Sequence, residues 1–372
     1  MKTLENQVAI IGGGLAGLVS AHLLAKGGFE VVLFEKKTFP FHRVCGEYLS
    51  REALGFLQRE TLLPTGLDWP VQSSFEYSDT SGKSASIALD LGGIGISRYV
   101  LDDWMALRAK QSGAQILEGI QVEEVVFHPK EDLFQLRLSD GKEHFAKNVL
   151  GAFGKRSKLD KALNRPFISR RSPYLGVKYH IRTDFDSSKV ALHNFEGGYC
   201  GINAIEEGKF NLCYLGLSDH SKQHGSIEAM ERNILWKNPQ LKRIWSESEF
   251  LFEKPEVISE ISFEPKSPVE NHLLMIGDSA GLITPLCGNG MAMAIRSGMM
   301  VSLLLLQNFP RTQMEQAYSN AWREEFAFRL WVGRQSQKLF GSGKTSAFGR
   351  VLIEHFPSFS RNIIRKTHGM PF

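Results

Sequence analysis

The stretch Val8-Ala-Ile-Ile-Gly12-Gly-Gly14-Leu-Ala16-Gly17-Leu-Val-Ser-Ala-His-Leu-Leu-Ala25 decides the fold of this chain. Its first four residues form an apolar run typical of a buried parallel strand, and helical apolar spacing follows the glycines. Gly12, Gly14 and Gly17 occupy the G-x-G-x-x-G positions, which serve a tight turn, the approach of a pyrophosphate and close helix packing. The stretch therefore predicts a strand, a turn and a helix whose N-terminus binds a dinucleotide.

A second strand strengthens this prediction. Residues 30–34 form the next expected strand, which ends in Glu35, about 20 residues beyond the glycines, where a carboxylate binds an adenosine ribose. A membrane span needs about 20 apolar residues, and the three glycines interrupt this run. A signal peptide needs a basic leader, whereas Met1–Gln7 carries only Lys2 against Glu5.

Composition indicates a globular protein with room for two domains. The 372 residues are 42% hydrophobic and 23% charged, which allows a large buried core. The formal net charge of +4 is too small to predict binding to nucleic acid. The four cysteines lie far apart in the chain, so we expect no metal site, no disulfide framework and a cytoplasmic location.

Periodicity predicts an antiparallel sheet inserted into the nucleotide-binding domain. Alternating apolar residues favour strands at 84–91, 177–181, 190–195, 199–205, 210–215 and 257–263, with a helix over 227–241. Further apolar runs favour strands of the first domain at 114–117, 121–127, 133–138, 148–152 and 272–276, and helices over 101–110 and 291–306. We expect the segment between Glu35 and Ser50 to be a loop, because prolines interrupt it.

The C-terminal segment from Thr312 has helical spacing and a basic character. Residues 310–372 hold ten Lys and Arg against four Glu, and aromatic residues lie among these charges. Two interpretations stay open. The helices pack on the body of the protein with a solvated basic face, or they make weak contact with a membrane surface, which would make the protein membrane-peripheral.

Three parts of the chain together resemble the p-hydroxybenzoate hydroxylase superfamily of flavoproteins and, within it, the geranylgeranyl reductase-like branch. They are the glycine motif, Arg98 just before a helix, and the segment Gly277-Asp278-Ser-Ala-Gly-Leu-Ile-Thr-Pro285-Leu-Cys287-Gly288-Asn289-Gly290. The resemblance implies that FAD is the cofactor. It implies FAD contacts at Gly12, Gly14, Ala16, Gly17, Glu35, Arg98, Gly277, Asp278, Gly288, Asn289 and Gly290.

The resemblance also implies an α/β fold with three parts. A Rossmann-like FAD-binding domain comprises residues 1–65, 98–160 and 265–310. An inserted, mainly antiparallel β-sheet substrate domain comprises residues 66–97 and 161–264. A helical C-terminal cap comprises residues 311–372.

The segment from Pro40 to Ser50 contains Cys45-Gly46-Glu47 and resembles a stretch beside the flavin in the reductase branch. The candidate catalytic residues, for substrate orientation or proton transfer, are His42, Cys45, Glu47, Tyr199 and Asn203. A purely structural role for Cys45 and Glu47 stays open. We expect His180 and His193 to be strand residues that face solvent or a satisfied partner.

Three departures from the family pattern bear on the reaction. Phe153 stands where the hydroxylases carry an acid, so the electron donor is either transiently bound NAD(P)H or a separate flavin reductase. The segment from Tyr199 to Ala204 lacks the Trp and the Pro of prenyl reductases. No Trp-x-Trp-x-Ile-Pro signature of the flavin-dependent halogenases is found in the sequence.

We expect an FAD-dependent monooxygenase that hydroxylates a hydrophobic aromatic or polyketide-like small molecule through a flavin hydroperoxide. The alternative is a C=C reductase of an isoprenoid or lipid. A second alternative is a flavin-binding protein without turnover.

Overall fold

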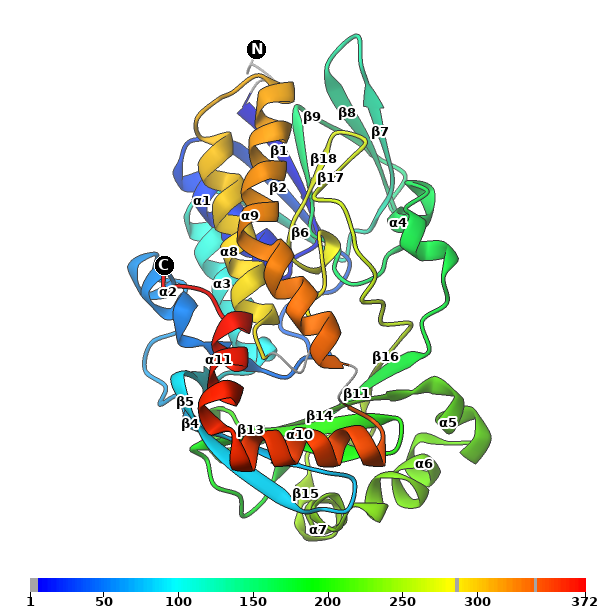
Figure 1. Ribbon diagram of the computed structural model, residues 1–372. Helices are drawn as coiled ribbons and strands as arrows, with labels where there is room; N and C mark the ends of the chain where they lie inside the picture. The colour runs from blue at the N-terminus through cyan, green and yellow to red at the C-terminus, as the bar shows by residue number, and fades with distance from the viewer. Residues whose placement is uncertain (1–5, 285–287, 338–339) are drawn as a thin grey trace.

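Two large sheets organise the computed structural model, which describes residues 6–284, 288–337 and 340–372 (Figure 1). The first sheet has six strands in the order β17-β18-β10-β1-β2-β6, and all pairs except β17 with β18 are parallel. Its strands are β1 (Gln7–Ile11), β2 (Glu30–Glu35), β6 (Gln115–Glu118), β10 (Asn148–Gly151), β17 (Val269–Glu270) and β18 (Leu273–Met275). The strand predicted at 148–152 therefore lies beside the strand of the glycine motif, and the strand predicted at 272–276 lies next to it in the same sheet.

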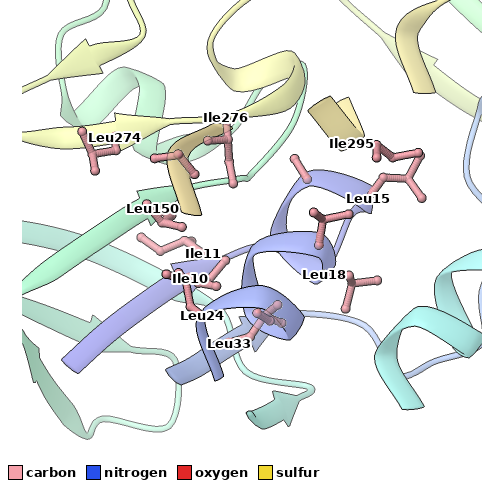
Figure 2. Close-up of a cluster of buried hydrophobic side chains, with 14 of the residues drawn as sticks. Ile10, Ile11, Leu15, Leu18, Leu24, Leu33, Leu150, Leu274, Ile276 and Ile295 are labelled. Carbon is pink, nitrogen blue, oxygen red and sulfur yellow. The ribbon is translucent and has the colours of Figure 1, made fainter. Parts of the chain in front are cut away.

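The core of this part forms because β1 is apolar on both faces, as parallel strands covered by helices are. Helix α1 (Leu15–Lys26) packs between α3 (Arg98–Gln111) and α8 (Gly290–Leu305). Figure 2 shows side chains from β1, β2, β10, α1 and α8 meeting in one cluster, in which Ile10, Leu18 and Leu33 are fully buried. The glycine motif is thus held by a rigid strand and a rigid helix.

The second sheet is mainly antiparallel and has the order β15-β11-β14-β13-β12-β4-β5-β3, with β16 beside β11. Only the pair of β4 and β12 is parallel. The strands are β3 (Tyr48–Ser50), β4 (Val71–Ser78), β5 (Ser84–Gly95), β11 (Tyr174–Arg182), β12 (Lys189–Phe195), β13 (Gly198–Ala204), β14 (Phe210–Leu217), β15 (Glu249–Phe250) and β16 (Glu256–Ser259). A small third sheet holds β7 (Val122–His128), β8 (Leu133–Leu138) and β9 (Glu143–Ala146).

Several elements differ from the predictions. The single helix expected over 227–241 is wrong: the structure has α6 (Ile227–Asn233), a short 3₁₀ turn and α7 (Pro239–Glu247). Asn238 causes the break, because its side chain caps α7 at Gln240 and donates to Ser78 and the Asn194 carbonyl, and Pro239 can only begin a helix. Residues 48–50, expected as loop, form β3, and the strand expected over 257–263 ends at Ser259.

Further helices complete the structure. A 3₁₀ turn over Arg51–Ala53 leads into α2 (Leu54–Arg59), and α4 (Lys158–Ala162) and α5 (Ser218–His224) are short. The C-terminal helices are α9 (Arg311–Gln337), α10 (Gly343–His355) and α11 (Pro357–Thr367). Helix α9 packs on α8, whereas α10 and α11 pack on β5, so these helices connect the two sheets (Figure 1).

Candidate active site

A cavity of about 1050 Å³ extends from the glycine loop to the second sheet and the C-terminal helices. Pockets for one small molecule usually measure roughly 300–1,000 Å³, so this cavity is as large as the upper end of that range. Its lining includes most of the predicted site residues: Gly12, Gly14, Ala16, Glu35, His42, Cys45, Glu47, Arg98, Tyr199, Asn203, Gly277, Asp278, Gly288 and Gly290. Gly17 and Asn289 are not part of this lining.

The glycine loop leaves no space for side chains where the backbone turns. Gly12 has φ of +110°, and a Cβ there would lie 2.4 Å from the Ala152 carbonyl oxygen. A Cβ on Gly17 would lie 2.1 Å from the Gly12 carbonyl oxygen, so Gly17 serves helix packing. Gly14 faces open space and gives α1 no side-chain cap. The first amides of α1 are therefore available to an anion such as a pyrophosphate.

Charged side chains surround this loop. The Glu35 carboxylate accepts from the Gly13 amide at 2.9 Å and from Arg43 at 3.1 Å. Arg43 also donates to Asp102 at 2.9 Å, and Asp102 holds Arg98 through two bonds of 2.6 and 2.8 Å. Two guanidinium groups thus stand beside the uncapped helix. This arrangement fits a dinucleotide whose phosphates approach α1 and whose ribose reaches Glu35.

The segment after β18 forms the opposite wall. The Gly277 amide donates to Ser297 Oγ at 2.8 Å, and a Cβ on Gly277 would lie 3.2 Å from Ala16. Lys266 fixes the next residue by donating to the Asp278 carbonyl at 2.8 Å, and burial lowers the pKa of Lys266 to about 8. Helix α8 begins at Gly290 without a side-chain cap, so its amides can also stabilise negative charge.

Asn289 does not line the cavity, unlike the other described residues that were predicted for this wall. It is fully buried, and its Nδ2 donates to the Thr367 carbonyl at 2.9 Å. Its side chain therefore holds α11 rather than a ligand. Pro285 and Cys287, which the sequence motif also included, lie outside the described residues.

Glu47 joins the two halves of the protein at the centre of the cavity wall. Its side chain is fully buried and accepts from Lys178 Nζ at 2.5 Å, His180 Nε2 at 2.7 Å and the Arg98 amide at 2.8 Å. Burial would raise the pKa of Glu47, but Lys178 and His180 lower it to about 2. The carboxylate stays ionised, so we interpret Glu47 as a positioning residue and not as a proton donor.

The backbone of Glu47 supports the same interpretation. Its φ of +50° lies in the left-handed region, which costs a non-glycine residue on the order of 1–3 kcal/mol. The Glu47 amide donates to Cys45 Sγ at 3.5 Å, and its carbonyl accepts from Ile96 and, at 3.4 Å, from Asn203 Nδ2. The contacts of Glu47 thus fix both Cys45 and Asn203.

Cys45 is half-buried, carries a free thiol and lines the cavity. Burial of Arg98 favours its neutral form, but the facing Asp102 carboxylate and Cys45 sulfur raise the pKa of Arg98. Cys45 therefore lies beside the Arg98 side chain, in the cavity lining that also contains the glycine loop and the second sheet.

His42 forms an aromatic wall beside this thiol. Its ring stacks on Tyr99 and contacts Phe252, each at a centroid distance of 4.6 Å. Burial, together with the charges of Lys178 and His180, lowers the pKa of His42 to about 4. The imidazole is neutral near pH 7, and its buried Nδ1 has no hydrogen-bond partner among the described residues.

The second sheet supplies the far wall. Tyr199 is buried, lines the cavity and meets the Phe340 ring edge-on at 5.2 Å. His180 and His193 are strand residues, as expected, and both are buried. Of the two expected environments, solvent or a satisfied partner, each has the second: Glu47 for His180 and Ser78 for His193, at 2.9 Å.

Four charged residues of the site were missed by the sequence analysis: Arg43, Asp102, Lys178 and Lys266. Arg43 lies only two residues before Cys45, so its place in that segment was an available signal. Lys178 and Glu47 are 131 residues apart, and no local pattern connects them. Among the described residues, no group of three His, Cys, Asp or Glu side chains is arranged to hold a metal ion.

Comparison with a family model matches residues 5–309 to the family described as FAD binding domain. Conditioned medium factor receptor 1 of Dictyostelium discoideum is 25% identical, covering 86% of this chain and 68% of that protein. Menaquinone reductase of Mycobacterium tuberculosis is 24% identical, covering 80% and 76%. Digeranylgeranylglycerophospholipid reductase 2 of Methanopyrus kandleri is 22% identical, covering 91% and 87%.

A solved structure supports the fold. The structure of a flavin-dependent brominase superposes with a TM-score of 0.77 at 18% identity, covering 97% of this chain and 92% of the brominase chain. This similarity confirms the predicted α/β fold with its inserted sheet and C-terminal helices.

Proposed function

Since the chain belongs to the FAD-binding-domain family and is an FAD-dependent oxidoreductase, we propose that it reduces a C=C bond of an isoprenoid lipid. This proposal reverses the preference for hydroxylation that the sequence suggested. Two of the relatives reported above are named as reductases of menaquinone and of a digeranylgeranyl phospholipid. Both substrates carry long unsaturated isoprenoid chains.

The observation that carries the proposal is the apolar lining that the second sheet and the C-terminal helices give the cavity. This lining includes Leu192, Leu215, Phe340, Leu352, Ile353, Ile363 and Ile364. A polyprenyl chain is long, flexible and apolar, and burying it against such a lining is favourable at about 0.8 kcal/mol per CH₂ group. A compact aromatic substrate would not need so many apolar contacts.

Different residues of the chain would bind the cofactor and donate the proton in such a reduction. FAD, once bound and reduced by an external donor such as NAD(P)H or a flavin reductase, would supply the hydride and return to its oxidised form. Arg43, Arg98 and the N-terminus of α1 would hold the phosphates, and the N-terminus of α8 would stabilise negative charge on the cofactor. Saturation of a C=C bond also requires a proton on the second carbon, and the Cys45 thiol is the donor that we assign. Glu47 and Arg98 position that thiol, and the apolar walls exclude water.

An anaerobic product analysis tests the proposal. The holoprotein is reduced chemically under argon and incubated with a digeranylgeranyl phospholipid, and the product is analysed by mass spectrometry. We expect a product that gains two hydrogen atoms per double bond without oxygen. A product that appears only in the presence of oxygen and gains one oxygen atom would contradict the proposal and restore hydroxylation.

A further inference from the structure

The C-terminal helices expose an unusual set of apolar side chains. Among the described residues, all six large apolar side chains that are more than half exposed lie in residues 328–370. They are Phe328 and Trp331 on α9, Phe348 on α10, Phe356 and Phe359 at α11, and Met370 after α11. We call these six residues the aromatic surface. Helix surfaces that face water are normally polar, and gathered exposed apolar groups mark interaction sites.

The helices that carry this surface are packed together. Helix α11 contacts both α9 and α10, and Lys366 on α11 lies 5.9 Å from the Phe328 ring on α9. Phe328 and Trp331 stack at 6.1 Å. Figure 1 shows α10, α11 and the end of α9 on the same side of the molecule. Other side chains of α10 and α11, including Ile353 and Ile364, line the cavity. One layer of helices therefore separates the cavity from the aromatic surface.

The charge of this region indicates what covers it. Residues 340–372 hold five Lys and Arg against one Glu, so they account for the entire formal net charge of +4. Arg361, Arg365 and Lys366 are exposed on α11 and form no ion pair with any described residue. Exposed aromatic groups beside unpaired cations are the combination that an anionic lipid surface recognises, by insertion of the rings and attraction of the charges.

We infer that the aromatic surface docks on an anionic membrane and lays α10 and α11, the outer wall of the cavity, against the lipid. Among the described residues, no helix is both long and apolar enough to cross a bilayer, and docking at the surface does not require one. That the membrane delivers the isoprenoid substrate rests on the proposed function. The docking itself rests only on the exposed side chains and charges, and it is tested without substrate.

Sedimentation with vesicles tests the docking. The full-length holoprotein is mixed with vesicles of phosphatidylcholine, with and without about 30% phosphatidylglycerol. We expect binding to the anionic vesicles that weakens as salt is added. The double variant Phe356→Ser/Phe359→Ser should bind at least about tenfold more weakly. The matched control Phe145→Ser, whose ring is 40% exposed on β9, should bind like the unaltered protein.

A charge variant keeps the test independent of the aromatic substitutions. Arg361→Gln/Arg365→Gln should lose about fivefold in binding per charge removed, with an unchanged thermal midpoint. Three results would overturn the inference: no binding of the unaltered protein to anionic vesicles, equal weakening in the Phe145→Ser control, or self-association through Phe356 and Phe359 without vesicle binding. Because no isoprenoid is present, none of these results depends on the reaction that the enzyme catalyses.

Discussion

The two ends of the cavity are built by different means. At the dinucleotide end the site depends on backbone geometry: Gly12 turns the chain, Gly17 allows close packing, and the uncapped α1 presents its amides. At the junction with the second sheet the site depends on side chains from distant segments, with Glu47 held by Lys178 and His180. A short local sequence is enough to form the dinucleotide end. The junction forms only when distant segments of the chain have folded together.

This contrast gives the two ends different sensitivities. A substitution at the dinucleotide end should change cofactor affinity by steric exclusion, and a substitution at Glu47 should change the stability of the junction by leaving a buried charge unpaired. Variants at the two ends of the cavity separate these two effects.

Glu47→Gln should lower the free energy of unfolding by about 3–5 kcal/mol, because the buried Lys178 ammonium loses its counter-ion. Denaturant unfolding measures this loss. The double variant Glu47→Gln/Lys178→Met should recover most of it, since no buried charge then remains. The matched control Glu249→Gln, in an exposed pair with Arg182, should cost less than about 1 kcal/mol. An equal loss in both single variants would contradict the account of the junction.

The same ion pair should make the protein sensitive to acid. The pKa of Glu47 is lowered to about 2 in the folded protein, so its stabilising effect is present above the ordinary Glu pKa of about 4.5 and is lost as pH falls toward 2. The lowered pKa of Glu47 thus contributes about 3 kcal/mol to the free energy of unfolding near neutral pH. Unfolding measured at about pH 5 and about pH 3 should bring the unaltered protein and Glu47→Gln closer together at the lower pH. A constant difference between the two would mean that Glu47 does not titrate as described.

Cys45→Ser should reduce the rate of product formation about 100-fold while leaving FAD content unchanged, because a serine hydroxyl is a far weaker proton donor. The effect belongs to the junction and not to the dinucleotide end. Cys213→Ser is the comparison, since Cys213 lines the same cavity and burial raises its pKa to about 12. Similar losses of rate in both variants would contradict the assignment of Cys45 as the proton donor.

Gly14→Ala should weaken FAD binding at least about tenfold, or about 1.4 kcal/mol, with no change in thermal stability. A Cβ at Gly14 meets nothing closer than Arg98 at 3.7 Å, so the fold accepts it, but the pyrophosphate would not. Gly201→Ala at the substrate end also has space, with its nearest atom at 3.6 Å, and should leave FAD affinity unchanged. Titration of the apoprotein with FAD distinguishes the two.

The sequence predicted the parts that local geometry determines. The strands and helices around Gly12, Gly17 and Gly277 follow from apolar runs and glycine spacing. Gly12 and Gly277 line the cavity, whereas Gly17 packs against Gly12 outside the lining. The break at Asn238 was missed, because its reason is a set of hydrogen bonds to Ser78 and Asn194, far away in the chain. Lys178 was missed for the same reason: in sequence it is one polar residue in an alternating strand, and only pairing of β11 beside Glu47 makes it part of the site.

The most direct test of the proposed reduction follows the oxidation of the bound cofactor. The flavin is reduced under argon, and its absorbance is recorded by stopped flow after a digeranylgeranyl phospholipid, which carries no quinone ring, is added. We predict that the lipid reoxidises the flavin without oxygen, at a rate that falls about 100-fold in Cys45→Ser. Reoxidation that needs oxygen, or that proceeds at one rate whatever lipid is present, would contradict the account.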